Sequence, residues 1–257
     1  MSIAIWAVLA IPGLAYWVYY LRGLPRPALP TEKSATFGSG DMVAAILLGL
    51  LFAWNIFAGT QKPPTITRDM IIQSCVIYSL FVVMLLSMLI VRNRNPVLLF
   101  GLKWPAWKSE LPLAALALVA LYPLLSVIQS GVLAVVGEKD ATQDILLFLI
   151  RTNTVEDKLL LSLMAVVFSP ISEEIIFRGF LYGVARQYGG RWAAMTVTAA
   201  LFAAIHIHFP SMPSLFAFAV GLTLIYERTR SLWAPIIVHM LFNATTVAYV
   251  LIAKPQL

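Results

Sequence analysis

Long apolar stretches dominate the chain, and short polar segments separate them. Several stretches approach 20 residues, enough for a helix to cross a hydrocarbon core of ~30 Å at a rise of about 1.5 Å per residue. A membrane β-barrel would instead show short segments of alternating polarity. The pattern predicts eight helices, at 3–20, 42–58, 70–91, 111–136, 159–187, 192–206, 214–226 and 232–253.

The predicted fold class is therefore all-α, a polytopic membrane protein with about eight transmembrane helices in one domain, 1–257. The first apolar run ends in aromatic residues and lacks a basic start, so we expect a retained span rather than a signal peptide. The segment 22–41, rich in Pro, Gly and Ser, is the most linker-like part. Prolines within or near the predicted spans mark kinks or helix starts, namely Pro12, Pro123, Pro170 and Pro235.

Composition supports a membrane protein, since 60% of the 257 residues are hydrophobic and only 12% are charged. A soluble domain is usually about a quarter charged. The net charge of +6 suits anionic lipid headgroups, and no Lys/Arg cluster indicates nucleic-acid binding. Cys75 is the one cysteine, so an intrachain disulfide is excluded.

The basic residues predict an orientation in the membrane. With eight spans, the loops on one side carry eleven Lys and Arg residues and those on the other side carry six. Because basic loops stay in the cytoplasm, the segment 92–110 is expected inside and both termini outside.

Two glutamates stand out among the twelve acidic residues. Ten fall in loops or at helix ends, whereas Glu173 and Glu174 are flanked on both sides by apolar helix. A charge at the bilayer centre costs about 2.5–3.5 kcal/mol even on lenient scales. The pair therefore predicts a polar site inside the membrane domain. Glu174 and Arg178 are four residues apart and share a helix face, which leaves Glu173 without that partner.

The three histidines of the chain all lie in its last quarter, at or within predicted helices. His206 ends one predicted helix and shares a face with Phe202, while His239 and Asn243 share a face of the last helix. His208 points away from His206 and is left out of the cluster.

Each of these residues also has a purely structural interpretation. Glu174 with Arg178 can be a structural ion pair, and a membrane histidine can simply bond a neighbouring helix. The set Glu173, His206, His239 and Asn243 is harder to explain as scaffold alone. Ser169 and Pro170 predict a helix start there, with Ser169 as its N-cap.

A carboxylate and an imidazole that share a water can deprotonate it. Attack on an amide also needs donors for the oxyanion. Glu173 and His206 as water activators, with His239 and Asn243 as oxyanion donors, would make a peptide hydrolase without a cofactor. The same region could hold zinc through Glu173, His206 and His239, although an H-E-x-x-H pattern is absent.

Three short motifs carry a resemblance to a known family. Glu173-Glu174-x-x-x-Arg178, Phe202-x-x-x-His206 and His239-x-x-x-Asn243 resemble the motifs of the CAAX prenyl endopeptidase and bacteriocin-processing (CPBP, formerly Abi) membrane proteins. The resemblance covers residues 169–246. It implies an eight-helix, metal-independent glutamic protease whose site opens to the cytosol. In it Glu173 and His206 would activate water, and His239 and Asn243 would hold the oxyanion. Glu174, Arg178 and Phe202 would be supporting residues of the motifs.

The resemblance divides the chain into variable N-terminal helices, 1–150, and catalytic core helices, 159–253. The expected partners are the bilayer and a peptide or membrane-protein C-terminus, with or without a lipid, in a bacterial cytoplasmic membrane.

Two alternatives remain: a non-catalytic bacteriocin-immunity or scaffold protein of the same fold, and a proton-coupled transporter that uses Glu173 and the histidines as a relay.

Overall fold

A computed structural model of the protein describes residues 11–13, 15–17, 22, 36–61, 66–102, 107–137 and 143–253. Within these ranges the chain is helical and contains no strand. The predicted all-α fold of a multi-pass membrane protein is confirmed. The first predicted helix, 3–20, lies mostly outside the described residues, and its described parts, 11–13 and 15–17, are helical.

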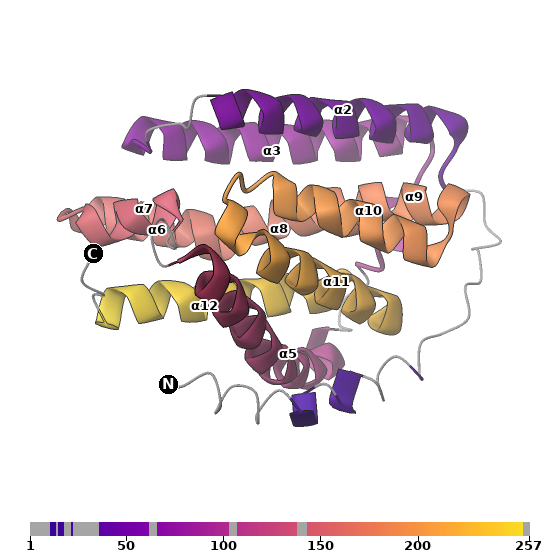
Figure 1. The fold of residues 1–257 in the computed structure, drawn as a ribbon. Helices are drawn as coiled ribbons and strands as arrows, with labels where there is room; N and C mark the ends of the chain where they lie inside the picture. The colour runs from indigo at the N-terminus through magenta and orange to yellow at the C-terminus, as the bar shows by residue number, and fades with distance from the viewer. Residues whose placement is uncertain are drawn as a thin grey trace.

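The described elements follow one another in the order shown in Figure 1. They are α2 (Ser39–Gln61), α3 (Arg68–Val91), α4 (Pro96–Phe100), α5 (Trp107–Val136), α6 (Asp144–Arg151), α7 (Val155–Leu163), η2 (Met164–Phe168), α8 (Ser169–Glu174), η3 (Ile175–Leu181), α9 (Tyr182–Gly189), α10 (Arg191–Ala204), η4 (Phe209–Ser211), α11 (Met212–Thr229) and α12 (Trp233–Ala253).

The seven predicted helices that fall on described residues exist, with ends within four residues of the prediction. The two short helices α4 and α6 were not predicted. For α4 the signals were present in the sequence: the Asn95 side chain accepts from two backbone N–H groups, Pro96 follows it, and Gly101 ends the helix with φ 66°. Such Asn-Pro starts and left-handed glycine ends are ordinary helix boundaries.

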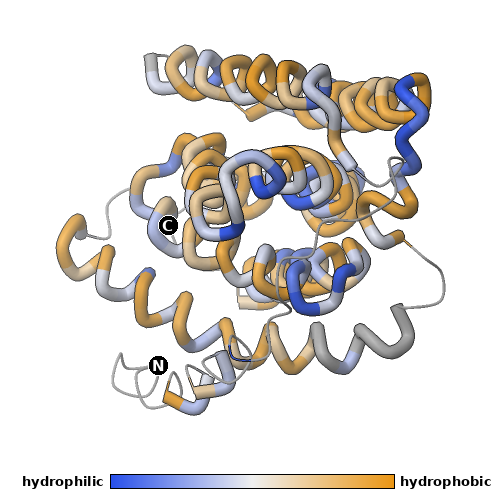
Figure 2. Tube along the Cα trace, turned by 90° about the vertical axis from the view of Figure 1, so that its right-hand side faces the viewer, coloured by the Kyte–Doolittle hydropathy of each residue, from blue (hydrophilic) through white to orange (hydrophobic). Residues whose placement is uncertain are grey.

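Six helices in the described part of the chain are long and apolar enough to cross a membrane. α10 has only 14 residues, about 21 Å of helix, and the first predicted span is mostly undescribed. The predicted count of about eight is therefore not confirmed. Figure 2 shows mostly apolar residues along the helices, and many large apolar side chains are exposed, among them Leu47, Trp54 and Val83, as expected for helices that face lipid.

The helices pack in layers. Figure 1 shows α2 and α3 side by side on one face, α7 to α10 in the middle, and α5 and α12 on the opposite side. The main core is built from residues of all these layers, among them Leu89, Leu121, Phe177, Phe202 and Val238, each no more than 2% exposed. The middle layer therefore has protein on both sides, which shields its polar side chains from lipid.

Two charged clusters tie helix ends together. Asp41, 1% exposed, accepts from Arg92 at 3.2 Å and lies 3.7 Å from Arg94, so it fixes the start of α2 against the end of α3. Glu227, 3% exposed, joins the end of α11 to α9 and α10, pairing with Arg186 at 2.8 Å, Arg191 at 3.0 Å and the Tyr182 hydroxyl at 2.9 Å. The sequence placed both acids at helix ends but did not reveal that they are buried.

Candidate active site

The helix that carries the two glutamates runs unbroken through 35 residues, Val155–Gly189. Two π-helical stretches, η2 and η3, interrupt its α-helical pattern on either side of the six-residue α8. Pro170 has no N–H and would clash with the carbonyl four residues before it, and a π-helical turn accommodates such a residue. π-helical turns of this kind are frequent at functional sites.

The predicted N-cap role of Ser169 is wrong, because α8 begins at Ser169 but continues the helical stretch η2 without a break. Ser169 has helical angles, φ −62° and ψ −53°, and its side chain does not cap the backbone. Instead the Ser169 hydroxyl donates to Oε1 of Glu173, one turn ahead. Ser169 is thus a polar contact of the candidate base, a role that four-residue spacing could have suggested.

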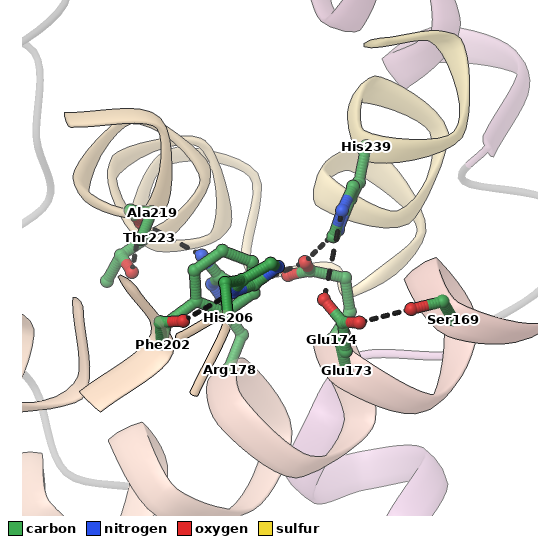
Figure 3. A network of polar contacts seen from close by, with 9 residues as sticks. All are labelled: Ser169, Glu173, Glu174, Arg178, Phe202, His206, Ala219, Thr223 and His239. Atoms are coloured by element: carbon green, nitrogen blue, oxygen red, sulfur yellow. Dashed lines mark hydrogen bonds and ion pairs between the residues drawn. The ribbon is translucent and has the colours of Figure 1, made fainter. Parts of the chain in front are cut away.

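Glu174 is fully buried and lies between two cationic or hydrogen-bonding partners. Its Oε1 accepts from Arg178 Nη1 at 2.9 Å and from His239 Nδ1 at 2.8 Å. The predicted Glu174–Arg178 pair is therefore present, and it extends to α12 through His239 (Figure 3). These two donors compensate the buried charge at Oε1, whereas Oε2 accepts no hydrogen bond from the described residues.

Glu173 is 5% exposed and, like Glu174, lies beside His239. While Oε1 accepts from Ser169, Oε2 lies 3.9 Å from Nε2 of His239. Oε2 accepts no hydrogen bond from the described residues. An acceptor that is buried and has no protein donor can receive a hydrogen bond from a water or a substrate, and such groups recur at functional sites.

The ring of Phe202 is the shared neighbour of the charged groups. The ring centres of His206 and His239 lie 5.0 Å and 5.9 Å from it. The guanidinium carbon of Arg178 lies 4.5 Å from the ring centre, within the range of a cation–π contact. Arg178 also donates to the carbonyl of Ala219 at 3.2 Å, which anchors it to α11 (Figure 3).

His206 lies two residues after the last residue of α10, in the turn that follows the helix, and is half-buried. Its Nδ1 lies 2.8 Å from the backbone oxygen of Phe202. A carbonyl oxygen can only accept, so Nδ1 carries the proton, and Nε2 of the neutral ring is left with its lone pair. This tautomer is the one that a general base needs.

The same reasoning applies to His239, which is 4% exposed. Glu174 is an acceptor for Arg178, so Nδ1 of His239 donates to it. Nε2 can then donate to an oxyanion, as the sequence predicts, only when the ring is doubly protonated. Oxygens of Glu173 and Glu174 both lie near the ring, at 3.9 Å from Nε2 and 2.8 Å from Nδ1.

Asn243 lies one turn beyond His239 on α12 and is half-buried. One of its two amide hydrogens is used in a bond from Nδ2 to the carbonyl of Ala165, at 2.8 Å. The other hydrogen of the amide is available to a substrate. The sequence did not predict this contact with η2, which fixes the direction of the carboxamide.

His208 bonds Ser211 instead of the cluster, through Nδ1 and Oγ at 2.8 Å. Across the described ranges, no group of three or more His, Cys, Asp or Glu side chains is placed to hold a metal ion. The role of Glu173, His206, His239 and Asn243 in catalysis and the absence of a metal stay predictions.

Comparison with known proteins points to one family. The model of the Rce1-like family, type II CAAX prenyl endopeptidases, matches residues 155–245. A Bacillus subtilis (strain 168) protein named "Putative membrane peptidase YdiL" is 26% identical over 88 residues, 34% of this chain and 36% of the relative. The chain thus covers about a third of that relative's length. No solved structure matches. Both matches support the resemblance to the CPBP family, and the family-model match spans every motif on which it rests.

Proposed function

We propose that this membrane protein, whose residues 155–245 match the Rce1-like endopeptidases, is an intramembrane peptide hydrolase of the glutamic type. The observation that carries the proposal is the setting of Glu173. Its carboxylate is buried within a membrane helix, one oxygen is held by Ser169, and the other faces His239 without a protein donor among the described residues.

In the proposed reaction, Glu173 and His206 take a proton from a water molecule. The resulting hydroxide forms a C–O bond to the amide carbon, and the C–N bond breaks when the tetrahedral intermediate collapses. The proton held by the base passes to the leaving amine. Nε2 of His206 is the lone-pair nitrogen for this transfer, because Nδ1 is committed to the carbonyl of Phe202.

His239 and Asn243 are proposed to hold the oxyanion. The protonated ring of His239 offers Nε2–H, and Asn243 offers the amide hydrogen that is not bonded to Ala165. Two such donors in a site that excludes water stabilise the transition state far more than they would in solution. Glu174 and Arg178 support them, since Glu174 orients His239 through Nδ1.

The proposed substrate is a peptide or the C-terminus of a membrane protein, with or without a lipid. The type II CAAX prenyl endopeptidase description of the matched family supports a C-terminal substrate. The proposed setting is a bacterial cytoplasmic membrane with the site open to the cytosol. We further propose that no metal takes part.

Quantitative mass spectrometry of membrane peptides tests the function. Cells that carry the wild-type protein are compared with cells that carry Glu173→Gln, which preserves side-chain size but cannot accept a proton at neutral pH. We expect new peptide termini only with the wild type, and loss of about 10²–10⁴-fold in turnover of any purified substrate. Full turnover by a well-folded Gln variant would contradict the role of Glu173. Identical termini in both strains would favour the non-catalytic scaffold.

A further inference from the structure

The turn after α10 has an unusual backbone. Ile207 directly follows the candidate base His206 and adopts a left-handed conformation with φ 49°. Helices often end on a left-handed residue, but it is usually Gly or Asn. For a β-branched side chain this conformation costs about 1–3 kcal/mol and persists only where the surroundings enforce it.

The Ile207 side chain packs against α2. Gly59, near the end of that helix, approaches the Ile207 side chain so closely that a Cβ atom at Gly59 would lie 2.3 Å from Cδ1 of Ile207. Glycine inside a helix is less favourable than alanine by about 0.8–1.0 kcal/mol. The close approach of Ile207 explains why a residue without a Cβ atom occurs at this position of the helix.

His206 lies between this contact and the bond that orients its ring. On one side, its Nδ1 donates to the carbonyl of Phe202. On the other, its carbonyl begins the peptide that leads into the left-handed Ile207. Beyond Ile207 the turn is closed by the bond between His208 and Ser211. A displacement of the backbone at Ile207 therefore reaches the backbone at His206, which is its direct neighbour in the chain.

We propose that Gly59 and Ile207 form a positioning contact for His206. Through it α2, which lies outside the family-matched region 155–245, sets the direction of the imidazole that takes the proton. Gly59 and Ile207 touch neither substrate nor water in this mechanism; they act through His206. That the His206 ring matters for catalysis rests on the proposed function. That α2 sets the direction of the ring does not depend on it.

The test is ¹⁵N NMR of histidine-labelled protein in detergent micelles. The described histidines are the full complement of the chain, His206, His208 and His239, and single His→Gln variants assign them. In the wild type we expect His206 as the Nδ1–H tautomer. Gly59→Ala pushes a methyl group against Ile207, so the His206 signals should shift toward a mixture of tautomers while those of His239 stay in place.

Two matched variants make the result specific. Gly49→Ala places a methyl group on the same helix with no atom within 4 Å of it, and we expect it to change none of the three rings. The double variant Gly59→Ala/Ile207→Val removes the clashing Cδ1, while the next atom, Cγ1, lies 3.5 Å from the added Cβ. We expect it to restore the wild-type His206 signals.

An unchanged His206 spectrum in Gly59→Ala would overturn the proposal. So would a shift that the double variant does not restore, because the effect would then not pass through Ile207. The spectra need no substrate, so this outcome is separate from whether the protein cleaves peptides. If a cleaved peptide is found, Gly59→Ala should lower kcat with little change in KM, and the double variant should recover kcat.

Discussion

The Glu174 carboxylate and the His239 imidazole lie 2.8 Å apart and join α8 to α12 across 65 positions of the sequence. The same carboxylate oxygen accepts from Arg178. Glu174 thus has two tasks: it neutralises a buried guanidinium, and it fixes which nitrogen of His239 faces Glu173. A change at Glu174 should affect folding and the geometry of the site together.

Glu174→Ala is expected to destabilise the protein strongly. Arg178, 2% exposed, would keep its charge in the interior without a carboxylate, and breaking a buried pair costs about 3–5 kcal/mol. For a chain of this size that corresponds to a fall in Tm on the order of 10 °C. Thermal unfolding in detergent measures it.

Glu156→Ala is the matched control, because Glu156 is exposed on the same continuous helix. Its Tm should stay close to that of the wild type. Equal Tm values for the two variants would show that the Glu174–Arg178 pair contributes nothing to stability.

Sequence alone predicted the parts of this protein that depend on local spacing. The apolar runs located the long helices, and four-residue spacing paired Glu174 with Arg178. The bond from Glu174 to His239 could not be predicted, because it depends on how α12 packs against α8. For the same reason the bond from Asn243 to Ala165 was missed, as was the burial of Asp41 and Glu227.

The error at Ser169 has a different origin. Serine followed by proline is a common helix start, and the sequence gives no sign that a preceding π-helical turn can accommodate the proline. Once the helix continues through Pro170, Ser169 lies one turn before Glu173 and its hydroxyl is free to bond the carboxylate. Local rules therefore failed at a site where the helix departs from regular α geometry.

Ser169→Ala should lower activity while leaving the fold intact. The variant removes the donor that holds Oε1 of Glu173, and a hydrogen bond to a charged group contributes about 1.5–3 kcal/mol. We expect a loss of roughly 10-fold or more in kcat, with a smaller fall in Tm than for Glu174→Ala. Ser169→Thr keeps the hydroxyl and should recover much of the activity. A fully active Ala variant would show that Glu173 is oriented by other groups.

The orientation in the membrane is tested by cysteine labelling on a Cys75→Ser background. The bias of eleven basic residues to six predicts that the segment between α3 and α5 is cytoplasmic. In intact cells an impermeant thiol reagent should label Asn153→Cys, on the opposite side, and should not label Lys103→Cys. Both should react after permeabilisation. The reverse pattern would place the termini in the cytoplasm.

The last prediction concerns zinc. A catalytic zinc site usually has three protein ligands and an open position for water. Asn243 is a poor zinc ligand. The described residues contain no group of three His, Cys, Asp or Glu side chains placed around a common centre. We therefore expect proteolysis to survive exhaustive chelation and the purified protein to carry well under one zinc per chain.

Thermal unfolding with and without chelator gives an independent readout. A metal bound to the native state raises Tm, and removing it lowers Tm, so an unchanged Tm is expected here. His239→Ala would not serve this purpose, because it also breaks the buried bond to Glu174. Stoichiometric zinc, together with activity that chelation abolishes and zinc restores, would instead make Glu173, His206 and His239 metal ligands.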